Sequence, residues 1–317
     1  MSRLPAGFTS NALCSIQKVY QGLSLVHTPH EFWPYRPGLA HHLNPAIRIS
    51  ILDSSFNPPT LAHLALINSR PSDGPSDQAT ASDTDYDARL LLLSVSNPDK
   101  TLKPADASYI QRLQMMYLLS LNVSANHSPS SPSESHLSSN TAIAVINAST
   151  FVSKSAVLLP FLRTRLASLR RPLITATNDI PTIPHPKLIF LMGYDTLVRV
   201  FSARYYASEH EAMRLLRNFL SPGAEDCRVV CAHRTSPPNT RTFEDATENN
   251  MLDITKEFIR GERIYLIDIG EDEQTFSSSE VRTKIVAGNN DWRHLVTNFV
   301  ADYLVENQLY VSDTQSM

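Results

Sequence analysis

Short apolar runs alternate with segments of helical period along most of the chain, and this alternation limits the possible folds more than any other feature. Strands that are apolar along their whole length fit a sheet covered on both faces, and helices between them make the strands parallel. We therefore predict an α/β fold, a doubly wound parallel sheet of Rossmann-like type, over residues 46–312. Its strands are expected at 47–52, 90–95, 142–146, 187–192, 229–232 and 264–269, and its helices at 61–67, 109–121, 151–169, 196–201, 278–287 and 294–307.

Residues 1–45 are expected to form an extension in front of this domain. Leu13, Ile16, Tyr20 and Leu23 fall at helical spacing, which predicts a helix over 11–25 that packs on the domain. The stretch from 28 to 45 contains four prolines and is expected to be an extended connector.

Three polar segments interrupt the pattern. Residues 70–88 contain five aspartates, 124–140 contain eight serines, and 172–186 are rich in proline. Such segments cannot bury enough apolar surface to offset the entropy of ordering them, so we predict exposed, disordered loops. A role of the aspartate- and serine-rich loops in docking unknown protein partners is left open.

The overall composition excludes several classes of function. The formal net charge is −3, which argues against a broad basic face for nucleic acid. Three cysteines are too few for a disulfide framework, and no apolar run approaches the roughly 20 residues of a membrane span. We expect an intracellular protein, cytoplasmic or nuclear, with no nucleic acid or membrane partner. The N-terminus has only weak targeting features, so a mitochondrial location stays open.

The first predicted strand runs into the segment Asp53–His63, which carries a hydroxyl and an imidazole at the start of the next helix. In open α/β sheets, ligands bind beyond the carboxyl ends of the strands, and a helix N-terminus attracts anions. Thr60 and His63 lie one helical turn apart, so both side chains could face a bound phosphate. The same residues also fit a plain helix cap and a surface histidine.

Two further groups follow later strands. Phe276–Arg282 contains three consecutive serines and an arginine in the first helical turn, where the helix dipole disfavours a cation unless an anion is bound. Gly193–Asp195 follows the strand at 187–192. All three groups should meet at one edge of the sheet, where hydroxyl, imidazole and guanidinium groups would suit a polyphosphate. The sequence contains no GxSxG, GxxxxGK[ST] or GxGxxG motif.

These motifs resemble those of the HxGH nucleotidyltransferase superfamily. Ser-Ser-Phe-Asn-Pro-Pro-Thr-x-x-His at 54–63 resembles its GSFNP…(H/T)xxH element, and 276–282 resembles its ISSTxxR element. A threonine in place of the first histidine is similar to the eukaryotic nicotinamide mononucleotide adenylyltransferases. The resemblance covers residues 46–310, and the sequence of the first motif is most similar to a divergent fungal branch. Further segments that match the family follow in order: Lys100, the Arg112–Met116 helix, Leu191–Leu197, Arg234 and Val300–Tyr310.

The resemblance implies a nucleotidyltransferase fold and the joining of ATP and nicotinamide mononucleotide into NAD and pyrophosphate. It implies Mg²⁺ as the companion of ATP, and only small-molecule substrates. It also assigns expected roles. Catalysis falls to His63, Thr60 and Arg282; binding of ATP and its phosphates to Ser54, Ser55, Phe56, Lys100, Gly193, Asp195, Ser277 and Ser278; binding of the nicotinamide nucleotide to Tyr206 and Arg234; no residue is expected to be a resident metal ligand.

Four residues depart from the family pattern. Ala62 replaces a glycine or methionine and Ser279 replaces a threonine, and the other two changes bear on phosphate binding. Ser54 stands where the family has glycine, and Asp53 places a carboxylate close to the expected phosphates. Two alternatives therefore stay open. One is another nucleotidyltransferase of the superfamily, for example one that transfers adenylate to phosphopantetheine. The other is a nucleotide-binding regulatory protein with little turnover.

Overall fold

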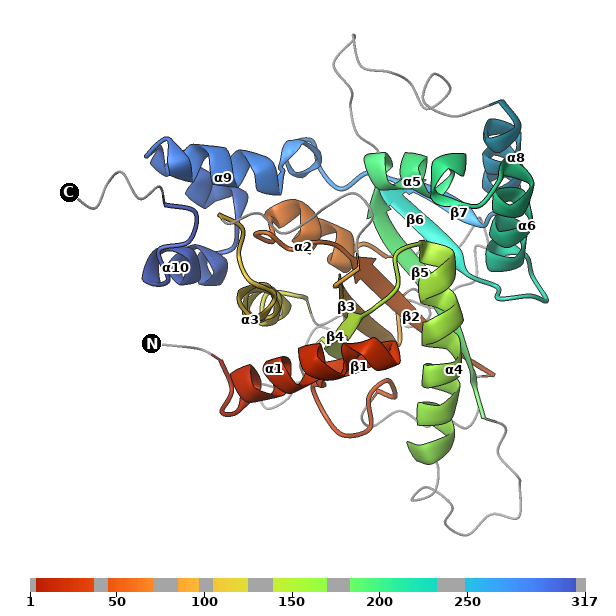
Figure 1. The fold of residues 1–317 in the computed structure, drawn as a ribbon, viewed down its shortest axis with the longest axis horizontal. Coiled ribbons are helices and arrows are strands. Elements are labelled where there is room, and N and C mark those ends of the chain that lie inside the picture. The colour runs from red at the N-terminus through yellow and green to blue at the C-terminus, as the bar shows by residue number, and fades with distance from the viewer. Residues whose placement is uncertain are drawn as a thin grey trace.

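The fold is built on one mostly parallel sheet, which in the described residues has seven strands in the order β1-β4-β3-β2-β5-β6-β7 (Figure 1). The computed structural model describes residues 4–36, 45–70, 85–96, 105–124, 139–169, 183–232 and 249–311. The predicted α/β fold with a doubly wound sheet is confirmed. The strands are β1 Leu23–His27, β2 Ala46–Asp53, β3 Ala88–Ser94, β4 Thr141–Ile146, β5 His185–Gly193, β6 Arg228–Ala232 and β7 Ile264–Ile267.

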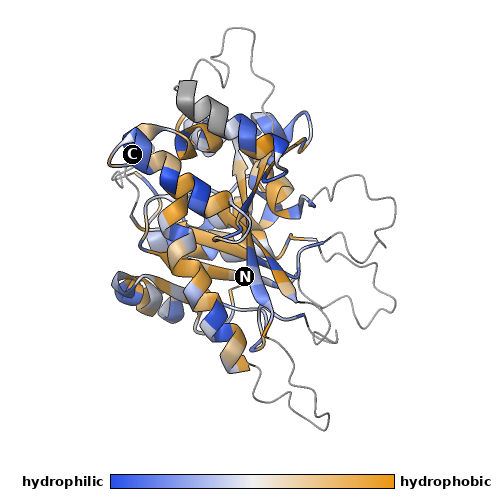
Figure 2. Cartoon of the chain, turned by 90° about the vertical axis from the view of Figure 1, so that its right-hand side faces the viewer, coloured by the Kyte–Doolittle hydropathy of each residue, from blue (hydrophilic) through white to orange (hydrophobic). Residues whose placement is uncertain are grey.

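Helices cover both faces of this sheet. Alternate residues of each central strand point to opposite faces: Leu90 and Leu92 of β3 enter one core, and Leu91 and Leu93 enter the other. Figure 2 shows hydrophobic residues concentrated along the strands that lie between these helices. The helices are α1 Phe8–Lys18, α2 Leu61–Asn68, α3 Tyr109–Ser120, α4 Phe151–Leu169, α5 Tyr194–Val200, α6 Glu209–Leu220, α8 Asn249–Arg260, α9 Ser278–Val286 and α10 Asn298–Glu306.

The order of the strands reverses between β2 and β5. From β2 the chain proceeds to β3 and β4 on one side, and it then crosses through α4 to β5, β6 and β7 on the other. The carboxyl ends of β2 and β5 therefore flank the point at which open α/β sheets bind their ligands. On one side of this point, α9 and α10 pack with α3 in a separate apolar cluster. In the described residues, no helix is both long and apolar enough to cross a membrane.

The N-terminal helix is confirmed but is shorter than predicted. It ends at Lys18, and Gly22, with φ of 112°, breaks the helical path in a conformation that glycine tolerates. Leu23–His27 then form β1, which pairs antiparallel with β4 at the edge of the sheet. The helical prediction failed over 23–25 because a period fitted to four apolar residues ran past this glycine.

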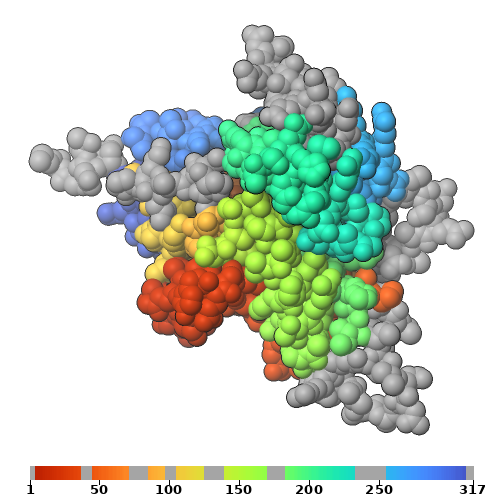
Figure 3. Space-filling view, turned by 45° about the vertical axis from the view of Figure 1, so that its right-hand side comes forward, coloured from red at the N-terminus to blue at the C-terminus, as the bar shows by residue number. Residues whose placement is uncertain are grey.

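The described part of the expected connector is anchored to the core. The side chain of Trp33 is fully buried, and its indole N–H donates to the carbonyl of Asn140 over 3.2 Å. The Arg165 guanidinium of α4 donates to the Trp33 carbonyl over 2.6 Å. In the space-filling view, the red N-terminal segment lies next to the yellow-green α4 (Figure 3). Residues 28–36 thus link the start of β4 to α4.

The three predicted loops lie largely outside the described residues, at 71–84, 125–138 and 170–182. At some of their described residues, the expectation of exposure is wrong. Asp85 and Tyr86 are buried, and β5 begins at His185, inside the third predicted loop. Asp85 is buried because it pairs with Arg89, whose side chain is only 2% exposed, over 3.0 Å. A buried guanidinium requires such a partner.

We predict that Asp85→Ala lowers the free energy of unfolding by about 3 kcal/mol or more, because it leaves Arg89 buried without its carboxylate. Urea unfolding followed by circular dichroism measures this change. Glu211→Ala is the matched control, since the exposed Glu211–Arg214 pair on α6 should contribute less than about 1 kcal/mol. Equal losses in the two variants would contradict the prediction.

Candidate functional site

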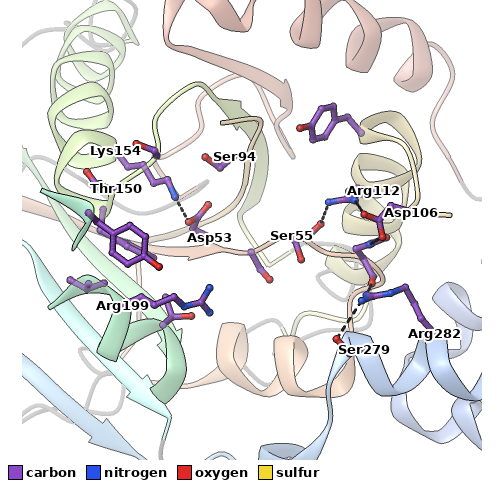
Figure 4. Close-up of a pocket in the computed structure, with 18 of the residues that line it drawn as sticks. Asp53, Ser55, Ser94, Asp106, Arg112, Thr150, Lys154, Arg199, Ser279 and Arg282 are labelled. Carbon is purple, nitrogen blue, oxygen red and sulfur yellow. Dashed lines mark hydrogen bonds and ion pairs between the residues drawn. The ribbon is translucent and has the colours of Figure 1, made fainter. Parts of the chain in front are cut away.

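A cavity of about 730 Å³ opens at the carboxyl ends of the central strands. Its lining comes from the ends of β2 and β3, the start of α4, helix α5, the segment 105–112 and helix α9. Figure 4 shows Lys154, Asp53 and Arg199 on one side of the close-up, and Arg112 and Arg282 on the other. The cavity therefore lies where the strand order reverses and is charged at both ends.

The first motif forms the N-terminus of α2 beside this cavity. Thr60 is the residue before the helix and is fully buried. Its backbone N–H donates to His63 Nδ1 over 3.0 Å, so this ring nitrogen must be an acceptor. In the neutral imidazole the proton then sits on Nε2, which donates to Ser54 Oγ over 2.9 Å. The histidine is thereby oriented from behind, by the backbone that precedes its own helix.

The structure separates the residues of this motif by position. Ser54 and Ser55 line the cavity. His63 does not line it but is hydrogen-bonded to Ser54. Phe56 is fully buried and packs against the His63 ring, with the ring centroids 5.4 Å apart. Phe56 thus supports the histidine, and its side chain is no part of the cavity lining.

The second motif forms the N-terminus of α9 and is tied directly to the first. Ser277 caps the helix by accepting the Glu280 amide over 3.2 Å, and Ser278 Oγ donates to the Pro58 carbonyl over 2.7 Å. Arg282 donates to the carbonyl of Asn57 and lines the cavity. Of the three serines, only Ser279 lines the cavity. Ser278 thus joins the two motifs and Ser277 caps α9, and neither side chain lines the cavity; their expected binding of phosphate stays a prediction.

The third motif, Gly193–Asp195, lies next to the cavity, and residues that follow it supply the lining. Gly193 and the exposed Asp195 lie at the start of α5 but do not line the cavity, whereas Thr196 and Arg199 do. The Arg199 guanidinium donates to the Asp195 carbonyl over 3.1 Å. The sequence analysis selected Gly193 and Asp195 because of the Gly-x-Asp pattern, and it missed Arg199, one helical turn later.

Tyr206 lines the cavity, as does its neighbour Tyr205. The Tyr206 hydroxyl donates to the Val200 carbonyl over 2.8 Å, and burial raises its pKa above the ordinary value. The ring is therefore fixed in place while it faces the cavity. Two further expected residues, Lys100 and Arg234, lie outside the described residues.

Asp53 is neutralised by a residue that sequence reasoning missed. Lys154, in the first turn of α4, places its Nζ 2.5 Å from Asp53 Oδ2. The two side chains are only 5% and 9% exposed, and the ammonium also lies 4.9 Å from the centre of the Phe151 ring. The carboxylate that seemed to disfavour phosphate therefore carries its own counter-charge. Lys154 could not be identified from sequence spacing, because it lies 101 positions from Asp53. The sequence could only indicate that an acid beside a phosphate site needs a cation as its partner.

The charges of the lining favour an anionic ligand. Four cationic side chains face the cavity, against the carboxylates of Asp53 and Asp106. Asp106 lies 3.6 Å from Arg112. Burial lowers the pKa of Arg112 while Asp106 raises it, and the guanidinium also holds the Ser55 carbonyl. An excess of positive charge in a concave site attracts polyanions. The cations are Arg112, Lys154, Arg199 and Arg282.

Among the residues that the structure describes, no three His, Cys, Asp or Glu side chains cluster in a way that could hold a metal ion. The two buried cysteines, Cys227 and Cys231, lie in and beside β6, where burial raises the pKa of each thiol. They act as small core residues.

Comparison with known proteins gives one curated relative. A Schizosaccharomyces pombe protein with the name "Putative nicotinamide mononucleotide adenylyltransferase" is 23% identical over 249 residues, which cover 77% of this chain and 78% of that protein. The resemblance to the nicotinamide mononucleotide adenylyltransferase family is confirmed. No family model matches the chain.

Solved structures are more distant. A Plasmodium falciparum nicotinic acid mononucleotide adenylyltransferase matches with 16% identity, over 83% of this chain and 97% of that chain, at TM-scores of 0.42 and 0.41 in its complexes with NaAD and with APC. Against the nicotinamide mononucleotide adenylyltransferase pattern, the two unusual residues, Asp53 and Ser54, each have a partner here: Lys154 and His63.

We predict that Asp53 and Lys154 are strongly coupled in stability. Lys154→Met should lower the free energy of unfolding by about 3 kcal/mol, because it leaves a buried carboxylate uncompensated. The double variant Asp53→Ala/Lys154→Met should lose much less than the sum of the two single changes, with a coupling of at least about 2 kcal/mol. Urea unfolding of the four proteins measures the cycle, and simple additivity would disprove the coupling.

Proposed function

We propose that this protein is a nicotinamide mononucleotide adenylyltransferase, which joins ATP and nicotinamide mononucleotide into NAD and pyrophosphate. One observation carries the proposal: helix α9 is hydrogen-bonded to the loop that leads into α2, at one cavity that is rich in cations. Helix N-termini with hydroxyl and guanidinium side chains suit phosphates. The similarity to the fission yeast protein supports the same reaction class.

The proposed chemistry needs no protein nucleophile. The 5′-phosphate oxygen of the mononucleotide forms a bond to the α-phosphorus of ATP while the bond to the pyrophosphate oxygen breaks. The protein contributes positioning and stabilisation of negative charge. Arg282 and Ser279, at the α9 side of the cavity, are suited to the departing pyrophosphate. Ser54 and Ser55, in the loop that leads into α2, are suited to the α-phosphate.

The opposite end of the cavity suits the acceptor nucleotide. Tyr205, Tyr206 and Phe151 supply aromatic surface for a pyridine ring, and Thr150 and Arg199 supply polar groups beside it. Lys100 and Arg234 keep the roles that the family resemblance implies for them.

We include Mg²⁺ in the proposal as part of the substrate. The ion would enter with ATP, bridge its phosphate oxygens and neutralise charge that develops on the leaving pyrophosphate. Arg112 and Arg282 would add to that neutralisation from the protein side.

We predict that Arg282→Ala lowers kcat/KM by about a hundredfold or more, because it removes a preorganised cation from the phosphate end. Arg282→Lys should recover only part of this loss, since an ammonium lacks the planar fork of a guanidinium. The measurement is coupled NAD formation from MgATP and nicotinamide mononucleotide. Arg214→Ala, on the exposed surface of α6, is the matched control and should behave as the unaltered protein.

The same assay tests the proposed function itself. Nicotinate mononucleotide and phosphopantetheine serve as alternative acceptors. If no acceptor yields pyrophosphate but ATP still binds saturably, the second candidate, a nucleotide-binding regulatory protein, replaces the enzyme. Ser54 is the observation that favours this second candidate, because its hydroxyl lies 2.9 Å from His63 Nε2, between the imidazole and the cavity.

We predict that Tyr206→Leu raises KM for the mononucleotide about five- to tenfold and leaves KM for ATP nearly unchanged, because an aromatic stacking contact contributes about 1 kcal/mol. Tyr206→Phe keeps the ring and should keep KM, although it loses the hydrogen bond to Val200 and some thermal stability. Initial-rate kinetics with each substrate varied in turn will check both. An effect of Tyr206→Leu on ATP alone would place the ring at the wrong end of the cavity.

A further inference from the structure

We propose that Ser54, not His63, makes the direct contact with the reacting phosphate, and that His63 is a positioning residue that acts through the serine hydroxyl. The proposal rests on the proposed function for its reaction, and on the hydrogen bonds of this chain for its geometry. It concerns the residue at which the sequence departs from the family glycine.

The two residues lie in series between the buried helix start and the cavity. Thr60 is fully buried, and its amide holds His63 Nδ1 over 3.0 Å. His63 Nε2 lies 2.9 Å from Ser54 Oγ. Ser54 lines the cavity, whereas His63 does not. The serine hydroxyl is therefore the member of this series that a bound ligand meets first.

The direction of the hydrogen bonds follows from the backbone. An amide can only donate, so Nδ1 accepts from Thr60, and Nε2 must carry the proton of the neutral ring. Ser54 Oγ consequently accepts from His63 and keeps its own O–H proton for another partner. In the described residues, the Ser54 hydroxyl has no other hydrogen bond. A hydroxyl that accepts one hydrogen bond donates a stronger one onward.

With glycine at this position, the imidazole N–H itself would face the cavity. The Ser54 side chain instead places its oxygen at hydrogen-bond distance from Nε2, so a phosphate oxygen cannot occupy the same place. No proton is transferred in this arrangement. The acceptor phosphate bonds to the α-phosphorus as pyrophosphate leaves, and the Ser54 O–H donates a hydrogen bond to an oxygen that gains charge.

The kinetic test compares Ser54→Ala, Ser54→Thr, Ser54→Gly, His63→Ala and the double variant Ser54→Ala/His63→Ala in NAD formation. Ser54→Ala should lower kcat about a hundredfold with KM for ATP within about threefold, since one donor to the developing charge is lost. His63→Ala should lose a similar amount, and the double variant should lose no more than either single variant. Ser54→Thr should retain most of the activity.

Ser54→Gly separates this series from simple packing. Removing the side chain lets His63 Nε2 reach the cavity, so kcat should stay within about tenfold of the unaltered protein and exceed that of Ser54→Ala. Ser168→Ala, a serine on the exposed face of α4, is the control and should have no effect. Full activity in Ser54→Ala alongside an inactive His63→Ala would overturn the proposal. So would losses that multiply in the double variant.

A second measurement does not depend on turnover. In the full-length protein with ¹⁵N-labelled histidine, the His63 signal is identified by its loss in His63→Ala, and inorganic pyrophosphate with Mg²⁺ is the probe. We expect Nε2 to carry the proton, and pyrophosphate to shift the Nε2 signal strongly in Ser54→Gly but only weakly in the unaltered protein. A proton on Nδ1, or equal shifts in both proteins, would overturn the proposal. If these signals are as expected but no dinucleotide forms, only the proposed function fails.

Discussion

Four hydrogen bonds converge on Asn57, a residue that is only 5% exposed, in the loop between β2 and α2. Its side-chain amide donates to Asp106 over 2.7 Å, and its side-chain oxygen accepts from the Ala107 amide and from the Tyr310 hydroxyl. Its backbone carbonyl accepts from Arg282. Asn57 thereby joins the loop after β2 to α9, to the segment before α3 and to Tyr310. The shape of the α9 end of the cavity depends on this junction, because Asn57, Asp106, Arg282 and Tyr310 all line the cavity there.

Buried ion pairs mark both ends of the sheet, and they have different consequences. Asp85 and Arg89 lie at the amino end of β3, away from the cavity, where the carboxylate lets a guanidinium remain within the core. Asp53 and Lys154 lie at the carboxyl end of β2 and line the cavity, where the ammonium cancels the charge of the acid. The first pair stabilises the fold. The second sets the electrostatics of the site, because an isolated carboxylate there would repel phosphate.

The central strands could be predicted because their residues are apolar on both faces, as Leu90–Leu93 illustrate. The two sequence motifs at 54–63 and 276–282 could be located because each lies at a helix start that follows a strand. Strand β1 could not, because its residues also fit a helical period and its partner β4 is more than 100 positions away. The side chains that face the cavity could not be predicted either. Ser277, Ser278 and Ser279 differ only in the direction in which their side chains point, and the local sequence does not determine that direction.

Two of the departures from the family pattern are adjacent in sequence, and each is compensated by a separate element. Asp53 is matched by Lys154 from α4, and Ser54 is matched by His63 from α2. In a site that had lost its activity, a buried acid without a counter-charge would still lower stability, so the Asp53–Lys154 pair alone does not indicate function. Such a site would, however, be under no constraint to keep the histidine hydrogen-bonded to the serine hydroxyl. Here the imidazole is still held from behind by the Thr60 amide and directed at the side chain that faces the cavity. The arrangement therefore favours an altered way of presenting a donor to phosphate over a decayed site, since the geometry of donation is preserved while the donating group has changed.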